Sequence, residues 1–116
     1  MRTTIYHNPH CTKSRQTLAL LKERGLAPTV IEYLRTPPDA ATLRRVLALL
    51  GVGPRGLLRT GEPAYRELGL DDPGKTDDEL IAAMVGHPVL IERPVVVVDD
   101  RRAAIGRPPE NVLDIL

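Results

Sequence analysis

The sequence predicts an α/β fold in which a mixed sheet is flanked by helices, and three observations carry that prediction. A strand, a helix and a second strand follow one another in the first third of the chain. The middle third reads as helices, and four consecutive valines, Val95–Val98, then precede a hairpin turn. Because 116 residues suffice for one hydrophobic core of ordinary size, we expect a single domain over residues 1–116.

The first third begins with a β-branched segment, Arg2–Tyr6, which is expected to form a strand. A polar loop follows it. Thr12–Arg24 then has leucines at helical spacing, and Gly25 stands where glycine is preferred after a helix. A second strand is expected over Thr29–Leu34. Since a strand–helix–strand unit returns the chain beside its first strand, the two strands are expected to be parallel.

The middle third, about residues 37–87, is expected to be a helical insertion. Its first helix is capped by Asp39 and has apolar residues at helical spacing. These residues are Leu43, Val46, Leu47 and Leu50. A short helix is expected over Pro63–Leu68. The sequence Thr76–Glu79 is a capping box, which opens a further helix running to Val85.

The last part of the chain is expected to be rich in strands. Val89–Ile91 reads as a short strand, and the valine run Val95–Val98 reads as a strand buried on both faces. The polar residues Asp99–Arg102 are typical of a turn, and Ala103–Ile105 is expected to pair back as a hairpin. Pro109–Leu116 is expected to be a terminal helix.

The predicted element order is therefore β-α-β, a helical insertion, and then β-β-α. The two outer blocks together have the order of the thioredoxin-like fold of the glutaredoxin type. Because that fold has a cis proline before its third strand, we expect a cis peptide bond at Pro94. The loop before that strand faces the loop after the first strand, so Arg93 is expected to approach Cys11.

Composition excludes several classes of partner. The formal net charge is +1 and the aromatic residues are three tyrosines, so we expect no nucleic-acid partner. We expect no secretory signal peptide and no membrane segment, because the N-terminus lacks a long apolar stretch and no apolar run approaches about 20 residues. The lone cysteine favours a reducing compartment, so we expect a cytoplasmic protein, and we expect a monomer because no feature of the sequence demands a dimer. Cys11 is the only cysteine, which excludes an internal disulfide and a cysteine-rich zinc site.

Cys11 stands between a predicted strand and a predicted helix, at or near the helix N-cap. Backbone N–H groups at that end point towards the sulfur, together with the positive end of the helix dipole. These groups belong to Thr12, Lys13 and Ser14, and nearby Lys13, Arg15 and a protonated His7 or His10 would add positive charge. We therefore expect the pKa of Cys11 to lie below the usual value of about 8.5.

Two other interpretations of Cys11 fit its surroundings less well. A lone cysteine is often a small buried apolar residue, but the polar loop around this one favours a reactive thiol. Thr17 stands where the phosphate loop of small cysteine phosphatases has arginine, which argues against that class. Ser14 stands where a C-x-x-C pair would have its second cysteine. Its hydroxyl can donate a hydrogen bond to the thiolate but cannot form a disulfide.

Three arginines stand out by position among the many in this chain. Arg59 follows two leucines, Arg93 precedes Pro94, and Arg107 precedes Pro108. Each taken alone is typical of a surface charge. Together they could converge on one oxyanion, since the planar guanidinium suits a tetrahedral anion.

The run Ile5–Pro9, with Cys11, Ser14 and Arg15, resembles the active-site loop of the glutaredoxin-linked arsenate reductases. The similarity continues in collinear order along the chain. It includes Tyr33-Leu34, Thr36-Pro37-Pro38, Leu57-Leu58-Arg59, Glu67-Leu68-Gly69-Leu70, His87-Pro88, Arg93-Pro94, Arg107-Pro108 and Val112-Leu113-Asp114-Ile115-Leu116. One departure is His10, at a position where the family often has a small residue.

The resemblance implies that the chain reduces arsenate to arsenite with glutathione and glutaredoxin, without a metal or a bound organic cofactor. It implies that Cys11 is the nucleophile and that His7 and Ser14 tune its thiolate. The implied substrate-binding residues are Arg59, Arg93 and Arg107, with Asn8 and Arg15 as further candidates in the loop.

Two alternatives share the expected fold. A glutathione-dependent thiol reductase would use Cys11 but would need no set of three arginines. An Spx-type regulator would bind RNA polymerase and often carries a C-x-x-C switch, which Ser14 interrupts here. The arginines and Ser14 favour the arsenate reductase interpretation.

Overall fold

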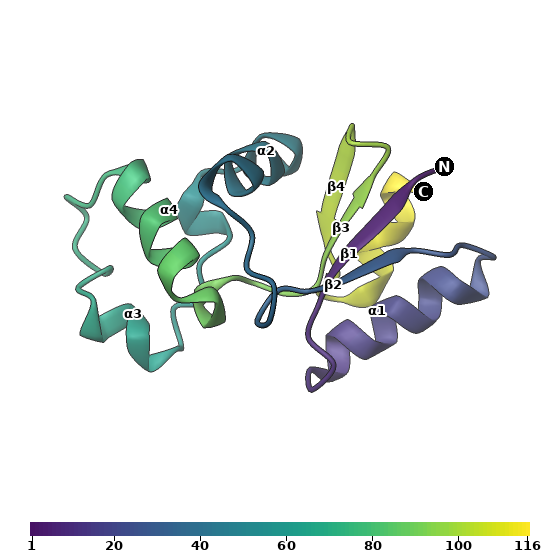
Figure 1. Cartoon of the computed structure of the whole chain (residues 1–116), viewed down its shortest axis with the longest axis horizontal. Coiled ribbons are helices and arrows are strands. Elements are labelled where there is room, and N and C mark those ends of the chain that lie inside the picture. Colours follow the sequence, from purple (N-terminus) through teal and green to yellow (C-terminus); the bar gives the residue numbers. More distant parts are fainter. The chain divides into compact units, whose positions relative to one another are not determined.

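The structure, a computed structural model, describes residues 1–116. The chain divides into two compact units, seen in Figure 1. One consists of Met1–Thr36 and Arg93–Leu116, and we call it the sheet unit. The other consists of Pro37–Glu92, and we call it the helical unit. No helix combines the length and apolarity needed to span a lipid bilayer.

The sheet unit holds a four-stranded mixed sheet with the strand order β2-β1-β3-β4. Strands β1 and β2 are parallel, as predicted, while β3 is antiparallel to both β1 and β4. The elements are β1 (Thr3–His7), α1 (Thr12–Glu23), β2 (Thr29–Glu32), β3 (Val95–Val98), β4 (Arg102–Ile105) and the 3₁₀ helix η3 (Pro109–Ile115). This is the mixed α/β arrangement that the sequence predicts.

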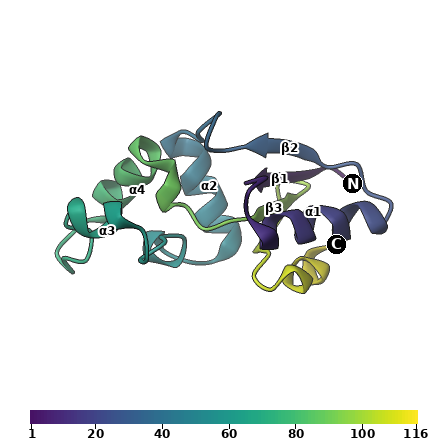
Figure 2. The ribbon, with the colours of Figure 1, turned by 90° about the horizontal axis from the view of Figure 1, so that it is seen from below.

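The core of the sheet unit lies between the sheet and its helices. All four valines of β3 are buried, as their uninterrupted apolar run predicts. The fully buried side chains of this core are Ile5, Leu21, Val96, Val98 and Val112. Leu21 of α1 and Val112 of η3 belong to this one cluster, and Figure 2 shows the two helices side by side. The packing of α1 therefore fixes the start of that helix relative to β1.

Two features of the sheet unit follow the predicted turn chemistry. Asp99 and Asp100 both have positive φ, and the Arg101 N–H donates to the Val98 carbonyl, which is the geometry of a type I′ hairpin turn. Gly25 follows α1 with φ of 77°. The Arg93–Pro94 peptide bond is cis, which confirms that prediction, and the Arg107–Pro108 bond is cis as well.

The helical unit contains three α-helices and two short 3₁₀ helices. They are α2 (Ala40–Leu50), η1 (Pro54–Gly56), α3 (Pro63–Glu67), α4 (Asp77–Gly86) and η2 (Pro88–Leu90). The Asp39 side chain caps α2 by accepting from the Thr42 N–H, and Gly51 ends this helix with φ of 70°. The capping box of α4 forms as predicted, with hydrogen bonds in both directions between Thr76 and Glu79.

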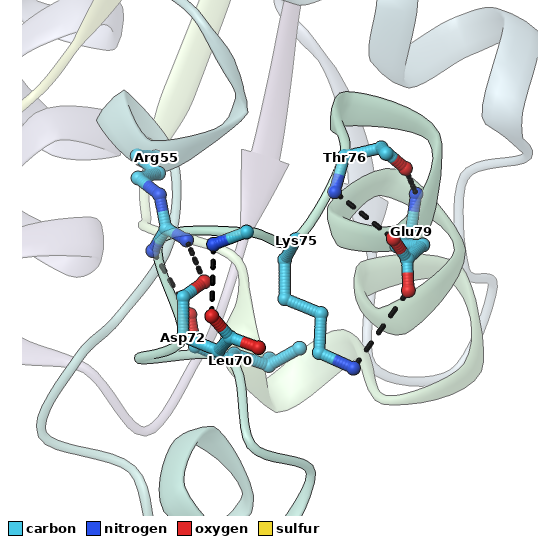
Figure 3. A network of polar contacts seen from close by, with 7 residues as sticks. Arg55, Leu70, Asp72, Lys75, Thr76 and Glu79 are labelled. Carbon is cyan, nitrogen blue, oxygen red and sulfur yellow. Dashed lines mark hydrogen bonds and ion pairs between the residues drawn. The ribbon is translucent and has the colours of Figure 1, made fainter.

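Arg55 fixes the loop that leads into α4, as Figure 3 shows. Its guanidinium donates to the carbonyls of Leu70, at 2.9 Å, and Asp72, at 2.8 Å. The Asp72 carboxylate in turn accepts from the Gly74 N–H. These bonds satisfy backbone groups that no helix or strand satisfies, so the loop is held without a regular element.

The structure corrects three predicted boundaries or element types. Residues 89–91 do not form a strand. Pro88–Leu90 is a 3₁₀ helix because its carbonyls bond three residues ahead, and Ile91 alone makes a bridge, to Leu58. Strand β2 ends at Glu32 rather than Leu34, because its carbonyl accepts from two N–H groups of the following turn. The C-terminal helix is of the 3₁₀ type.

Candidate functional site

The loop between β1 and α1 holds Cys11 at the N-cap of the helix, as predicted. The Cys11 N–H donates to the Asn8 carbonyl at 3.0 Å, which closes a tight turn directly after β1. The Arg15 N–H donates to the Cys11 carbonyl at 3.0 Å and begins the helical hydrogen bonding. The cysteine is only 8% exposed, so the thiol lies in a partly desolvated position.

Two arginines lie at the Cys11 thiol. Arg107 Nη1 is 3.8 Å from the sulfur, and the Arg93 side chain is close enough to hydrogen-bond it. Arg93 lies two residues before β3 and Arg107 two residues after β4, so neighbouring ends of two paired strands place both cations at the start of α1. Arg107 Nη1 also donates to the Arg93 carbonyl at 3.4 Å, which links the two segments.

The electrostatics of this position favour the thiolate. Burial alone raises the pKa of Cys11, but four contributions outweigh it: the Ser14 N–H, the charge of Arg93, the Lys13 N–H and the Arg93 hydrogen bond. The net result is a pKa of Cys11 below its ordinary value of 9.0. No side-chain hydrogen bond caps α1, so its first N–H groups, those of Lys13 and Ser14 among them, remain available to favour a thiolate at the N-cap.

A buried polar cluster lies behind the cysteine loop. The Ser14 hydroxyl and His7 Nδ1 are 2.6 Å apart, and the Asn8 N–H donates to the same hydroxyl at 3.0 Å. Ser14 is fully buried and His7 is 6% exposed. The sequence analysis noted that the Ser14 hydroxyl can donate a hydrogen bond to the thiolate. In the structure this hydroxyl instead forms hydrogen bonds with His7 and Asn8. The Ser14 backbone N–H is the group of this residue that favours the thiolate.

The sequence analysis offered a protonated His7 as a source of positive charge near the Cys11 thiolate, but the lowered pKa of His7 disfavours its protonated form. Burial lowers the pKa of this imidazole, and the nearby Arg15 and Lys22 lower it further, while Glu32 acts in the opposite direction. The net shift is downward from 6.5, so His7 is neutral near pH 7. Its contact with Ser14 therefore holds the loop in place instead of attracting an anion.

Asn8 and Arg15, the other predicted site residues of this loop, form hydrogen bonds with atoms of the same loop and of the first turn of α1. The Asn8 side-chain oxygen accepts from the His10 N–H at 3.0 Å. The Arg15 guanidinium donates to the Pro9 carbonyl at 2.9 Å and to the Thr12 hydroxyl at 3.2 Å. Both side chains therefore fix the conformation of the turn that presents Cys11.

Arg59 belongs to the helical unit, where it has carboxylate partners. Its Nη1 is 2.7 Å from Glu62, and its Nε is 3.7 Å from Glu92. Nη1 also donates to the Val89 carbonyl at 3.3 Å. Within the sheet unit the structure thus brings Arg93 and Arg107 together at Cys11, and within the helical unit it pairs Arg59 with Glu62 and Glu92.

A close contact that the sequence analysis missed holds the Arg107 segment against α1. The buried Thr17 hydroxyl lies 2.8 Å from the Lys13 carbonyl and 3.4 Å from the Gly106 carbonyl. A Cβ atom on Gly106 would lie 2.5 Å from the Thr17 hydroxyl and 2.8 Å from Pro94 Cγ. The signal in the sequence was a glycine directly before the Arg107-Pro108 pair, since glycine often marks a close approach of backbone.

Comparisons with known proteins agree on one family. Residues 6–115 match the ArsC family. A protein of Escherichia coli K12 described as uncharacterized protein YfgD is 55% identical over 113 residues, covering 97% of this chain and 94% of that protein. An arsenate reductase of Neisseria meningitidis serogroup A is 47% identical over 113 residues, covering 97% of this chain and 96% of that protein.

A solved structure gives the same result. The arsenate reductase from Vibrio cholerae matches with a TM-score of 0.97 and 52% identity, covering 100% of this chain and 98% of that one. The sheet order, the helices around it and this likeness together establish the thioredoxin-like fold. A family match that extends over nearly the whole sequence, and relatives aligned along almost their full lengths, lead to one conclusion: the chain belongs to the ArsC family.

Proposed function

We propose that this protein is an arsenate reductase in which Cys11 is the nucleophile. The observation that carries the proposal is a thiol with a lowered pKa beside two arginines, one of them 3.8 Å from the sulfur. A thiolate needs such cations to approach an anionic substrate, and a tetrahedral oxyanion needs guanidinium groups to hold it. The names of the relatives support arsenate as that oxyanion.

In the first step the Cys11 thiolate attacks arsenic of HAsO₄²⁻ and an oxygen leaves. Two protons convert the departing oxygen to water, and the product is the adduct Cys11–S–AsO₃H⁻, in which arsenic is still As(V). Arg93 and Arg107 offset the charge of the anion as it approaches the sulfur. On the resemblance to the family, Arg59 is the third arginine to bind this anion.

In the second step the thiol of glutathione attacks Cys11 Sγ. The sulfur–arsenic bond breaks, its electron pair stays on arsenic, and arsenite leaves as H₂AsO₃⁻. The two electrons come from the two sulfurs, which become a mixed disulfide between Cys11 and glutathione. The co-substrate is required because the chain has no second cysteine.

Glutaredoxin then restores the Cys11 thiol by thiol–disulfide exchange with the mixed disulfide. This cycle needs a reducing pool of glutathione, so we propose that the protein works in the cytoplasm. It uses no metal and no bound organic cofactor, since glutathione is consumed as a substrate.

The test is arsenate-dependent oxidation of NADPH in a coupled assay with glutathione, glutaredoxin and glutathione reductase. The wild-type chain should be active, and Cys11→Ser should lose turnover, because a serine hydroxyl is not ionised at neutral pH and is a far weaker nucleophile. Omitting glutaredoxin should leave a single turnover that ends in the mixed disulfide. Arsenite production by Cys11→Ser would contradict the mechanism.

The glutathione-dependent thiol reductase is the alternative that the same assay can distinguish. A folded wild-type chain that is inactive with arsenate, yet has a rapidly alkylated Cys11 and reduces a mixed-disulfide substrate, would favour that enzyme. The two arginines at the thiol support the arsenate reductase instead, because the sulfur atoms of a disulfide carry no charge for them to offset at the reacting centre.

A further inference from the structure

A cavity of about 540 Å³ opens beside the cysteine loop, within the sheet unit. One side is formed by the loop residues His7–His10, and the other by Glu32, Leu34 and Arg35. It lies where the parallel strands β1 and β2 end, since His7 and Glu32 are register partners at the last position of both. Crevices at the carboxyl ends of parallel strands are common binding sites for small ligands.

Two charged side chains of this cavity, those of Glu32 and Arg35, take no part in the hydrogen bonds or ion pairs of the fold. Glu32 is partly buried and Arg35 is exposed, and neither side chain forms a hydrogen bond or an ion pair, with the other or with any further residue. A half-desolvated carboxylate normally has a partner. The cavity thus presents an anion and a cation three residues apart, at the edge of a pocket whose other surfaces include the apolar Pro9 and Leu34.

Two opposite charges separated in this way are complementary to a zwitterion. The head group of an amino acid has an α-carboxylate, which suits the guanidinium, and an α-ammonium, which suits the carboxylate. A γ-glutamyl thiol such as glutathione carries this head group at one end and its thiol on the next residue.

The cavity is also within reach of the nucleophile. His10 lines the cavity and precedes Cys11 in the chain, so their Cα atoms are about 3.8 Å apart. In a γ-glutamyl thiol seven bonds join the glutamyl α-carbon to the sulfur, so an extended molecule can place its thiol about 8 Å from the head group. A head group in the cavity therefore leaves the thiol at the cysteine loop.

We propose that this cavity binds the amino-acid head group of the γ-glutamyl thiol that attacks the Cys11 adduct. Arg35 binds the α-carboxylate and Glu32 binds the α-ammonium. This inference rests on the proposed function for its occupant. It also separates the two substrates, because arsenate approaches the sulfur from the side of Arg93 and Arg107 and the thiol approaches from the side of His10.

The test is an NMR titration of the ¹⁵N-labelled wild-type chain with S-methylglutathione, which cannot react. The amides of His10, Glu32 and Arg35 should shift. Arg35→Gln and Glu32→Gln should each weaken binding about tenfold, as expected for the loss of one charge-assisted hydrogen bond. Arg24→Gln is the matched control, since Arg24 is an exposed arginine at the far end of α1, and it should bind like the wild type.

Two further ligands identify the head group. S-methylcysteinylglycine lacks the γ-glutamyl residue and should leave the amides of Glu32 and Arg35 unshifted. Free glutamate should shift them, but at higher concentration. Equal affinities for glutamate and S-methylglutathione would overturn the assignment to a thiol and indicate a free amino-acid site.

The cavity proposal and the proposed reaction can be disproved independently of each other. S-methylglutathione shifts confined to Arg93–Val95 and Gly106–Pro109 would overturn the cavity proposal, even in a chain that reduces arsenate. So would Arg35→Gln with an unchanged KM for glutathione in the coupled assay. Shifts at Glu32 and Arg35 in a chain inactive with arsenate would support the cavity as a γ-glutamyl thiol site and reject only the proposed reaction.

Discussion

Helices α1 and α4 begin in opposite ways. Thr76 and Glu79 cap α4 with reciprocal hydrogen bonds, and three acidic residues occupy its first turn. Cys11 stands at the N-cap of α1 without a capping hydrogen bond, and the first turn of α1 has no acidic residue. The free N–H groups and positive end that α4 neutralises are left available in α1, where they favour a thiolate. A helix end that is capped and one that favours a thiolate thus differ in their side chains, not in their backbone.

The largest effect is expected from Gly106→Ala, which tests whether the α1 end depends on tertiary support. The new Cβ would lie 2.5 Å from the Thr17 hydroxyl and 2.8 Å from Pro94 Cγ, so the Arg107 segment must move away from α1. We expect a loss of about 1–3 kcal/mol in the free energy of unfolding, measured in urea. Alkylation of Cys11 should also slow at neutral pH, because Arg107 leaves the thiol. Gly61→Ala is the matched control, since no atom lies within 4 Å of its Cβ position.

Thr76→Ala should cost about 1 kcal/mol in the free energy of unfolding, because it removes the side-chain acceptor of the α4 cap. The pH dependence of Cys11 alkylation should not change, since the substitution lies in the helical unit. A shift of the alkylation midpoint would show that the two helix ends are coupled and would remove the contrast between them.

Lys13→Glu gives α1 an acidic residue in its first turn, as α4 has. The carboxylate should stabilise the helix by about 0.3–1 kcal/mol through the dipole. The same charge should raise the pKa of Cys11 and slow alkylation at neutral pH. The expected result is therefore a rise in the free energy of unfolding together with a fall in the rate of Cys11 alkylation. Lys13→Gln serves as the neutral control. An unchanged alkylation midpoint with Glu at this position would mean that a side-chain charge in the first turn of α1 does not act on the sulfur.

The smallest effect concerns pH. Hydrogen bonds from Thr76, with the charge of Lys75, hold the pKa of Glu79 below 4.5, so its stabilisation is present above that pH and lost as pH falls through the lowered pKa. Cys11 also has a lowered pKa, despite the opposing effect of burial. Its stabilisation is complete above pH 9.0 and is lost as pH falls from there through the folded value.

The free energy of unfolding should therefore rise with pH in two separate windows, one acidic and one approaching pH 9. Glu79→Gln should reduce the first rise, to which the lowered pKa values of Asp39 and Asp99 also contribute, and Cys11→Ser should abolish the second, with urea titrations at intervals of pH as the measurement. A curve for Cys11→Ser that parallels the wild type near pH 9 would exclude a depressed thiol pKa.

Local chemistry explains what the sequence analysis predicted well. The caps at Asp39 and Thr76 involve partners three residues away, and the hairpin turn at Asp99 needs only its own neighbours. The hydrogen bonds that form such features join residues only about three positions apart, so the local sequence is enough to predict them. The position of Cys11 before α1 follows in the same way, and the approach of Arg93 to it followed from the order of the strands.

The errors and omissions depend on partners that are distant in sequence. Thr17 and Gly106 are 89 positions apart, and nothing near either one shows that they meet. The Ser14 hydroxyl had three possible partners in one loop, and packing selected His7 and Asn8. Val89–Ile91 has β-branched residues, yet Pro88 starts a 3₁₀ turn and only Ile91 finds a strand partner.

The single cysteine has a practical consequence for following the reaction. Any arsenic or glutathione adduct formed on a thiol of the chain must be attached to one atom, Cys11 Sγ. A mass spectrum of the quenched protein would therefore report the fractions of free, arsenic-bound and glutathione-bound enzyme directly, without peptide mapping. The fraction that accumulates would identify the slow step of the cycle.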